Sequence, residues 1–190
     1  MKLKGSETEK NLLKAFAGES QARNRYTFFS NQARKEGYEQ IAAIFVETAE
    51  NEKEHAELFF KHLLGGEVEI TAAYPAGVIG ATADNLKAAA DGEKMEWGKL
   101  YPEFADVAKK EGFEKIEETF REIADVEARH EARYRIFLKN VKAGTIFKKQ
   151  KLVLWKCRNC GNILEAAEAP AKCPVCYHDR AYFELFVENY

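Results

Sequence analysis

Three observations in the sequence predict an all-α four-helix bundle followed by a small metal-bound β/loop domain. Hydrophobic residues recur with helical spacing from residue 6 to about residue 142. This helical region contains one internal repeat, with a similar turn sequence in each half. All four cysteines lie between residues 157 and 176, in two CxxC pairs. We therefore expect two domains, residues 1–146 and residues 147–190.

The composition is that of a globular protein and argues against two classes of partner. The chain has 190 residues, 46% of them hydrophobic, and a formal net charge of −2, so neither nucleic acid nor an acidic membrane surface is expected as a partner. The N-terminal MKLKGSETEK lacks the apolar region of a signal peptide. We expect a cytoplasmic protein, in which paired cysteines indicate metal binding rather than disulfides.

Two helices form each half of the bundle. Residues 6–9 (SETE) are a capping box that starts the first helix, which should end near residue 37. The turns EGYE (residues 36–39) and EGFE (residues 111–114) precede the second and fourth helices and keep them in register. The other three helices are predicted from about Tyr38 to Leu64, Thr82 to Lys110 and Phe113 to Lys142.

Residues 64–80, LGGEVEITAAYPAGVIG, separate the two helical pairs and contain glycines and a proline that exclude a long helix. An extended segment of this length could span about 55 Å, whereas a helix of about 27 residues is roughly 40 Å long. The segment can therefore cross over the whole bundle. Two antiparallel pairs with one long crossover define the ferritin-like four-helix bundle.

The inward stripe of each helix, otherwise apolar, is interrupted by carboxylates and imidazoles. Heptad spacing puts Glu127 and His130 in line with Phe120 and Tyr134. Five buried carboxylates would be unstable without nearby positive charge, which two divalent or trivalent metal ions supply. The inward-facing polar residues are Glu19, Glu52, His55, Glu93, Glu96, Glu127 and His130.

This set has the pattern of a ferritin-like di-iron site, which takes one Glu from each of two helices and Glu-x-x-His from each of the other two. A single ExxH usually marks a solvated helix face, but here two occur in register inside apolar stripes. Oxygen-rich ligation with two imidazoles favours iron or manganese over zinc. We interpret Glu96, which has no counterpart in the first half, as a carboxylate that can enter or leave one metal's shell. Tyr26 and Tyr101 are placed where their hydroxyls could orient carboxylates.

The four cysteines predict a tetrahedral four-thiolate metal site. Cys157 and Cys160 lie in CRNCG, and Cys173 and Cys176 in CPVC. Zinc ribbons and one-iron rubredoxin centres use the same ligands, so the motif alone leaves the metal open. A di-iron site needs two electrons to be reduced, and a neighbouring iron–thiolate centre could deliver them one at a time. Short β-prone runs, residues 151–156 and 181–187, flank the cysteines.

Over essentially its whole length the chain resembles the rubrerythrins. The resemblance rests on AGESQARNRY, ENEKEH, GEKMEW, VEARH and the two cysteine motifs, in this order. It implies a cytoplasmic di-iron peroxidase that reduces hydrogen peroxide to water in oxidative-stress defence, with electrons relayed by a rubredoxin-like iron centre. It also implies a homodimer, with electrons passing between subunits. The external donor would be rubredoxin or a separate NAD(P)H-dependent reductase, since the chain has no GxGxxG motif.

The same resemblance implies a role for each residue of the helical site. Glu52 and Glu127 would bridge the irons, and Glu19 and Glu93 would be terminal ligands. His130 would bind one iron permanently. His55 and Glu96 would exchange as ligands of the other iron, His55 in the diferrous form and Glu96 in the diferric form.

Two other function classes stay open on the residues alone. One is a ferritin-like ferroxidase that oxidises and stores ferrous iron, with a structural zinc ribbon as its tail. The other is a zinc-ribbon binding module on a helical scaffold, which the inward carboxylates and the lack of a strongly basic face oppose. Cage assembly and zinc in the four-cysteine site would favour storage, whereas a dimer with iron in that site would favour the peroxidase.

Overall fold

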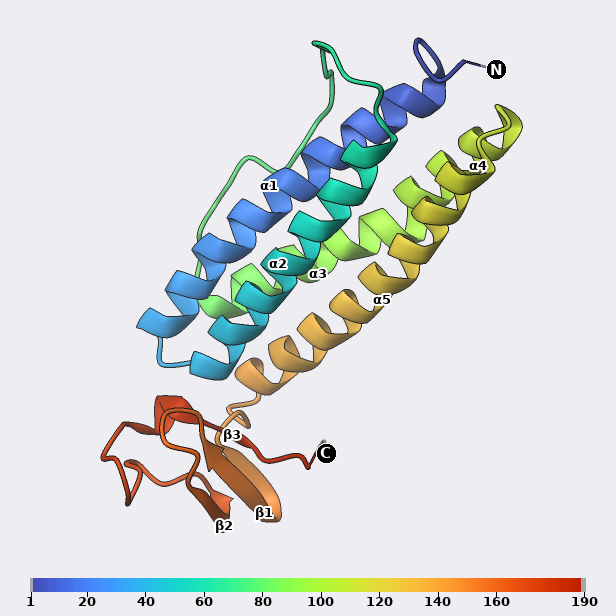
Figure 1. Cartoon of the computed structure of the whole chain (residues 1–190). Helices are drawn as coiled ribbons and strands as arrows, with labels where there is room; N and C mark the ends of the chain where they lie inside the picture. The colour runs from blue at the N-terminus through green and yellow to red at the C-terminus, as the bar shows by residue number, and fades with distance from the viewer. Residues whose placement is uncertain (1, 189–190) are drawn as a thin grey trace.

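The computed structural model describes residues 2–188, which form a helical bundle with a small β-domain at one end (Figure 1). The predicted four-helix bundle is confirmed, its third helix being interrupted by a π-helical segment. Within residues 2–188, no helix is both long and apolar enough to span a membrane. The bundle elements are α1 (Glu7–Lys35), α2 (Glu39–His62), α3 (Thr82–Met95), the π-helix η1 (Glu96–Leu100), α4 (Tyr101–Lys110) and α5 (Glu114–Lys142).

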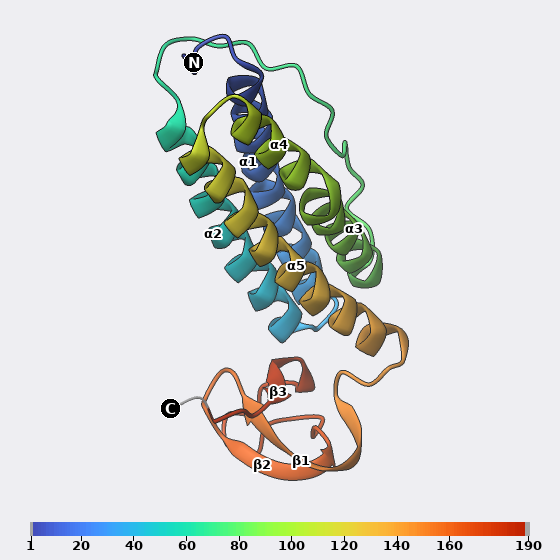
Figure 2. The same cartoon turned by 90° about the vertical axis from the view of Figure 1, so that its right-hand side faces the viewer.

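The helices form two antiparallel pairs, α1 with α2 and the run α3–η1–α4 with α5 (Figure 1). Between the pairs, the connector (residues 63–81) runs along the outside of the bundle from the end of α2 to the start of α3 (Figure 2). Residues 64–79 are all exposed. The crossover predicted for this segment is therefore present.

The continuous helix predicted from Thr82 to Lys110 was wrong in its middle, where η1 replaces one α-helical turn. A π-turn accommodates one extra residue in a helix and is frequent at functional sites. The extra residue is visible in the repeat: Glu19 to Tyr26 is 26 − 19 = 7 positions, whereas Glu93 to Tyr101 is 101 − 93 = 8. The second half thus carries a one-residue insertion that begins at Glu96.

The first glutamate of each repeated turn caps the first helix of the opposite half. Glu111 accepts from the Thr8 amide at 2.8 Å, at the start of α1. Glu36 accepts from the Thr82 amide at 3.0 Å, at the start of α3. These bonds satisfy helix N–H groups that have no intrahelical partner. The two repeat turns therefore tie the halves together at both ends of the bundle, a role that the sequence analysis did not identify.

We expect Glu36→Ala to lower the free energy of unfolding by about 1 kcal/mol at pH 7, the usual effect of losing a helix cap. Burial opposes ionisation of Glu36, but hydrogen bonds from Gln32 and Thr82 outweigh it and lower the pKa of this carboxyl. The contribution is therefore complete above the ordinary glutamate pKa of about 4.3 and is lost as the pH falls through the lower folded value. Urea unfolding at pH 7 and below pH 4 tests this, with Lys35→Ala as the control. An equal loss at both pH values would contradict it.

The bundle core has two apolar clusters. One is built around Tyr26, Phe45 and Tyr134, towards the β-domain. The other is built around Phe59 and Phe120, towards the far end. The inward-facing carboxylates and imidazoles lie along the helices between these clusters, so apolar side chains close the polar layer above and below.

The β-domain is a three-stranded antiparallel sheet with the order β2–β1–β3. The strand β2 was not predicted, because ILEAAE lacks a clear two-residue alternation. Trp155 of β1 is fully buried, and its indole N–H donates to the Ala166 carbonyl at 3.0 Å. Tyr38 stacks on Phe147 with ring centroids 6.1 Å apart, where the domain meets the bundle. The elements are β1 (Lys148–Cys157), β2 (Ile163–Glu168), the 3-10 helix η2 (Arg180–Tyr182) and β3 (Phe183–Leu185).

Candidate metal centres

Six of the predicted site residues lie in one buried layer, on the helices α1, α2, α3 and α5. α1 and α3 each contribute one glutamate, and α2 and α5 each contribute a Glu-x-x-His pair. Because residues three apart lie on one helix face, the histidine of each pair points the same way as its glutamate. Their exposed fractions lie between 0% and 7%. The residues are Glu19, Glu52, His55, Glu93, Glu127 and His130.

The possible ligand atoms form two overlapping groups, within each of which all atoms lie within 4.8 Å of one another. Glu52 and Glu127 belong to both groups. Each histidine turns its Nδ1 inwards: that of His55 lies 2.9 Å from a Glu52 oxygen, and that of His130 lies 2.7 Å from a Glu127 oxygen. The layer therefore offers two adjacent sites that share two carboxylates. The groups are Glu19, Glu52, His55 and Glu127, and Glu52, Glu93, Glu127 and His130.

No lysine or arginine among residues 2–188 lies within ion-pair distance of this layer. Arg23 and Arg133 pair instead with Glu50 and Glu47 on the surface. The carboxylates must therefore be neutralised in another way.

Without cations, protons neutralise the layer. Burial, followed by the charges of neighbouring carboxylates, raises the pKa of Glu19 and Glu93 well above its usual range. Burial alone would lower the pKa of each histidine, but close contacts with the Glu127 and Glu52 carboxylates outweigh burial and raise the pKa of His55 to about 10 and that of His130 to about 9. Metal ions would have to displace these protons in order to bind.

The donor set fits two metal ions on a further observation. Several buried atoms of the layer have no hydrogen-bond partner among residues 2–188. Buried polar atoms are rarely left unsatisfied in this way. A cation within each group would satisfy them, and oxygen-rich ligation with imidazole suits iron or manganese. The atoms are Glu19 Oε2, Glu52 Oε1, Glu93 Oε2, both Glu127 oxygens and His130 Nδ1.

Two buried tyrosines hold the glutamates of α1 and α3. The Tyr26 hydroxyl donates to Glu93 Oε1 at 2.6 Å, and the Tyr101 hydroxyl donates to Glu19. In each pair the tyrosine and the glutamate come from different halves of the repeat, so the two hydrogen bonds connect the halves across the bundle. The one-residue insertion in η1 gives Tyr101 the position that Tyr26 has in the first half.

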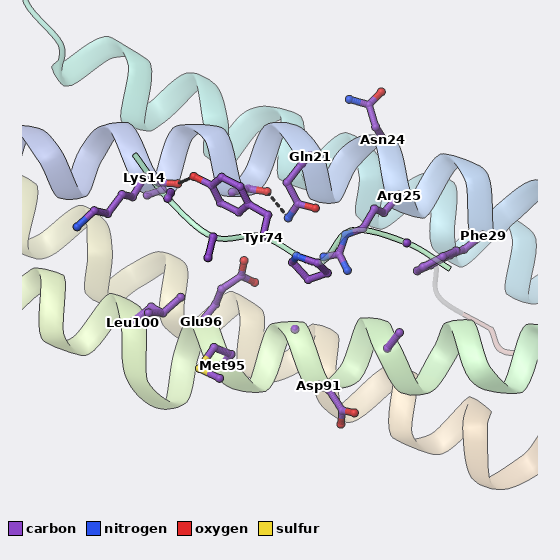
Figure 3. A pocket seen from close by; sticks show the side chains of 18 of the residues that line it. Lys14, Gln21, Asn24, Arg25, Phe29, Tyr74, Asp91, Met95, Glu96 and Leu100 are labelled. Carbon is purple, nitrogen blue, oxygen red and sulfur yellow. Dashed lines mark hydrogen bonds between the residues drawn. The ribbon is translucent and has the colours of Figure 1, made fainter. Parts of the chain in front are cut away.

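Glu96 belongs to neither ligand group. It is the first residue of η1 and is partly buried, and its carboxylate points into a cavity between α1 and the α3–η1 run (Figure 3). Burial, followed by the charges of Glu127 and Glu52, raises the pKa of Glu96 to about 8. The Glu96 carboxyl is therefore close enough to the layer for the charges of the other carboxylates to affect its ionisation.

The π-turn is held against α5 by a tryptophan to which the sequence analysis gave no role. The Trp97 indole N–H donates to Glu131 Oε2 at 2.8 Å, and Arg135 donates to the other oxygen of Glu131 at 3.1 Å. The Lys94 ammonium lies 3.5 Å from the centre of the Trp97 ring, within the range of a cation–π contact. These contacts fix the segment that carries Glu96.

The four cysteine sulfurs lie close together in the β-domain. The Cys157 and Cys176 sulfurs lie 3.7 Å apart, and the Cys160 and Cys173 sulfurs lie 3.6 Å apart. A disulfide needs about 2.05 Å, whereas a tetrahedron with metal–sulfur bonds of about 2.3 Å has edges of about 3.8 Å. The sulfurs are therefore spaced for a metal ion. The His178 amide is the main cause that lowers the pKa of Cys176 to about 6, which favours the thiolate.

Comparisons with known proteins agree with this geometry. The family model Rubrerythrin matches residues 10–138, and the model of the rubrerythrin rubredoxin-like domain matches residues 155–184. A rubrerythrin of Porphyromonas gingivalis is 58% identical, with 99% of this chain and 94% of that protein covered. A rubrerythrin of Nitratidesulfovibrio vulgaris is 52% identical, with 99% and 98% covered. A solved structure, of fully reduced, all-ferrous nigerythrin, has a TM-score of 0.63 and 33% identity and covers 96% of this chain and 87% of that one.

Proposed function

The chain belongs to the rubrerythrin family, and we propose that it is a non-haem di-iron peroxidase that reduces hydrogen peroxide to water in oxidative-stress defence. It has a di-iron carboxylate/histidine site and a rubredoxin-like four-cysteine site, and the family binds iron. The observation that carries the proposal is the presence of both sites in one chain. One suits a two-electron reaction, and the other suits one-electron supply.

We assign the bridging roles in the layer from the shared ligand groups, and the terminal, permanent and exchanging roles from membership of the rubrerythrin family. Glu52 and Glu127, which belong to both groups, would bridge the two irons, and His130 would bind one of them permanently. Glu19 and Glu93 would be terminal ligands, each fixed by a tyrosine. His55 and Glu96 would exchange as ligands of the remaining iron. Glu96 lies outside both groups, but its carboxyl is close enough to Glu127 and Glu52 for their charges to add to burial in raising its pKa, which supports this exchange.

When bound, the irons supply electrons and Lewis acidity for cleavage of the O–O bond. The chain's own residues hold the charge and the geometry. The carboxylates balance the cations, and the tyrosine hydroxyls keep Glu19 and Glu93 oriented as the charge changes. The apolar clusters on either side exclude water from the layer.

The electrons would come from outside the chain. The four-cysteine iron would accept them one at a time from rubredoxin or from an NAD(P)H-dependent reductase. We further propose a cytoplasmic homodimer in which electrons pass between subunits. The β-domain lies at the end of the bundle rather than beside its middle (Figures 1 and 2), which supports delivery to a second subunit.

We expect Tyr26→Phe to weaken ferrous binding by roughly 10-fold to 100-fold, as loss of a bond that orients a ligand does in other metal sites. The substitution removes the one hydrogen bond to Glu93 Oε1 and leaves the ring packing in place. Anaerobic titration with ferrous iron measures the change. Tyr134→Phe is the matched control, because this neighbouring buried hydroxyl makes no hydrogen bond to the layer. Equal affinity of both variants and the unmodified protein would contradict the assignment.

Iron stoichiometry and peroxide consumption separate the peroxidase from an iron-storing ferroxidase. A peroxidase keeps two irons in the helical layer and one in the cysteine site, however much ferrous iron is added. It converts one peroxide to water for every two electrons supplied and releases no dioxygen. Iron that accumulates far beyond these sites in air, together with zinc in the cysteine site, would support storage instead.

A further inference from the structure

We propose that the cavity beside the metal layer binds carboxylate-bearing alkyl hydroperoxides, such as those of fatty acids, so that the peroxidase acts on amphiphilic hydroperoxides as well as on hydrogen peroxide. This inference rests on the proposed function and names a further substrate class for the same site. It is carried by the size of the cavity, the nature of its walls, one unpaired guanidinium and the position of Glu96.

The cavity lies between α1 and the α3–η1–α4 run, with the connector passing between them (Figure 3). Its volume is about 1020 Å³, whereas one water molecule takes up about 30 Å³ in the liquid. Hydrogen peroxide has only two heavy atoms and leaves almost all of this space unused. Pockets for larger organic ligands typically measure about 300–1,000 Å³.

The walls of the cavity are mainly apolar. α1 contributes phenylalanine side chains, the connector contributes aliphatic ones, and the η1 and α4 segments close the other side. The Tyr74 hydroxyl donates to the Lys14 carbonyl at 2.8 Å and fastens the connector against α1. An alkyl chain would be removed from water here, which is the main source of affinity for an apolar ligand. The apolar lining includes Phe28, Phe29, Val78, Met95, Leu100 and Phe104.

Of the two cationic residues that line the cavity, Lys14 and Arg25, it is Arg25 whose guanidinium gives the cavity a preference for an anionic head group. Arg25 extends from α1 into the space between the helices (Figure 3). Among residues 2–188, no carboxylate lies within 4.0 Å of its guanidinium nitrogens, and its buried Nε has no hydrogen-bond partner. By contrast Asp91, which also lines the cavity, is already paired with Lys87 and Arg135. A ligand carboxylate would satisfy Arg25.

The cavity and the metal layer share a wall. The Glu96 carboxylate faces the cavity (Figure 3), and the Tyr101 side chain lines it while its hydroxyl donates to Glu19. A hydroperoxide held with its carboxylate at Arg25 can place its O–O bond at this wall. Reduction takes two electrons from the external donor through the iron sites and two protons. The O–O bond breaks, one oxygen leaves as water, and the other remains on carbon as an alcohol.

Binding is tested on the oxidised, iron-loaded protein with the hydroxy acid made by reducing linoleic acid hydroperoxide, which cannot react further. Calorimetric titration should show binding of the acid, and Arg25→Gln should weaken it by about tenfold, the effect of losing one charge-assisted contact. The methyl ester of the same compound has no carboxylate, so its affinity should be equal in both proteins. Arg34→Gln, an arginine on α1 outside the cavity lining, should bind the acid as the unmodified protein does.

Several results would overturn the inference. The first is no binding of the acid, which would indicate a cavity covered by a second copy. The others are equal affinity for the acid and the ester, or an Arg25→Gln variant that binds the acid as tightly as the unmodified protein does. Either of these would indicate detergent-like adsorption. Parallel turnover assays keep the two proposals apart. Reduction of hydrogen peroxide without reduction of linoleic acid hydroperoxide removes this inference alone. Failure with both peroxides removes the proposed function, while the binding titration still reports on the cavity.

Discussion

Glu127→Gln is expected to abolish stable binding of both metal ions in the helical layer, lowering ferrous affinity by more than about 100-fold, beyond the usual effect of losing a residue that only orients a ligand. Glu127 belongs to both ligand groups, and each of its oxygens lies within 2.8 Å of a histidine Nδ1. Glutamine keeps the size of the side chain but removes the charge and one acceptor. Loss of a shared ligand should therefore affect two ions at once, and peroxide reduction should disappear with them.

Iron analysis after anaerobic loading and desalting measures this directly. The variant should keep the single iron of the cysteine site and lose the two of the layer. Glu122→Gln is the control, because Glu122 lies on the same helix but is exposed. A variant that retains both layer irons and peroxide turnover would show that Glu127 does not bridge them.

The second large effect is expected when zinc replaces iron in the four-cysteine site. Zinc is held by the same tetrahedral thiolates but has no redox chemistry. The β-domain should therefore stay folded. The steady-state rate of peroxide reduction with an external donor should fall by about 100-fold or more, because the iron of the cysteine site carries the electrons. A single turnover of the chemically reduced helical layer should be unaffected.

Comparison of the iron and zinc forms separates electron transfer from folding, which Cys157→Ser alone would not do. A small metal-bound domain depends on its ion for stability, so a serine variant could lose activity by unfolding. Circular dichroism and thermal melting of the zinc form provide the control. Equal steady-state rates in the two forms would mean that electrons reach the helical layer without passing through the cysteine site.

The number, order and approximate ends of the bundle helices were predictable from the sequence because each depends on local spacing. The apolar stripes, the repeated turns and the glycine-bearing connector are all visible within short windows. The π-turn at Glu96 was not predicted, although the sequence contains its trace: Glu19 to Glu36 is 36 − 19 = 17 positions, whereas Glu93 to Glu111 is 111 − 93 = 18. The strand β2 was missed because its partner β1, rather than its own pattern, stabilises it.

The candidate site was predictable to the extent that charged residues occupied positions expected to be apolar. Glu52, His55, Glu127 and His130 were found in this way, and the structure brings them together. Trp97 and Glu131 gave no such signal, because an aromatic residue and a surface glutamate are ordinary in a helix. Their hydrogen bond joins residues 34 positions apart. Contacts of this kind depend on tertiary structure and could not be predicted from spacing.

The most direct test of the peroxidase proposal is anaerobic mixing of the fully reduced protein with a small excess of hydrogen peroxide, while the visible absorption of the iron–thiolate centre is recorded. The proposal predicts fast return of the red ferric–thiolate colour, because electrons leave the cysteine site to refill the layer that reduces the peroxide. If no colour returns, the cysteine site holds zinc or is uncoupled from the layer. That result would contradict the relay and favour the iron-storing alternative.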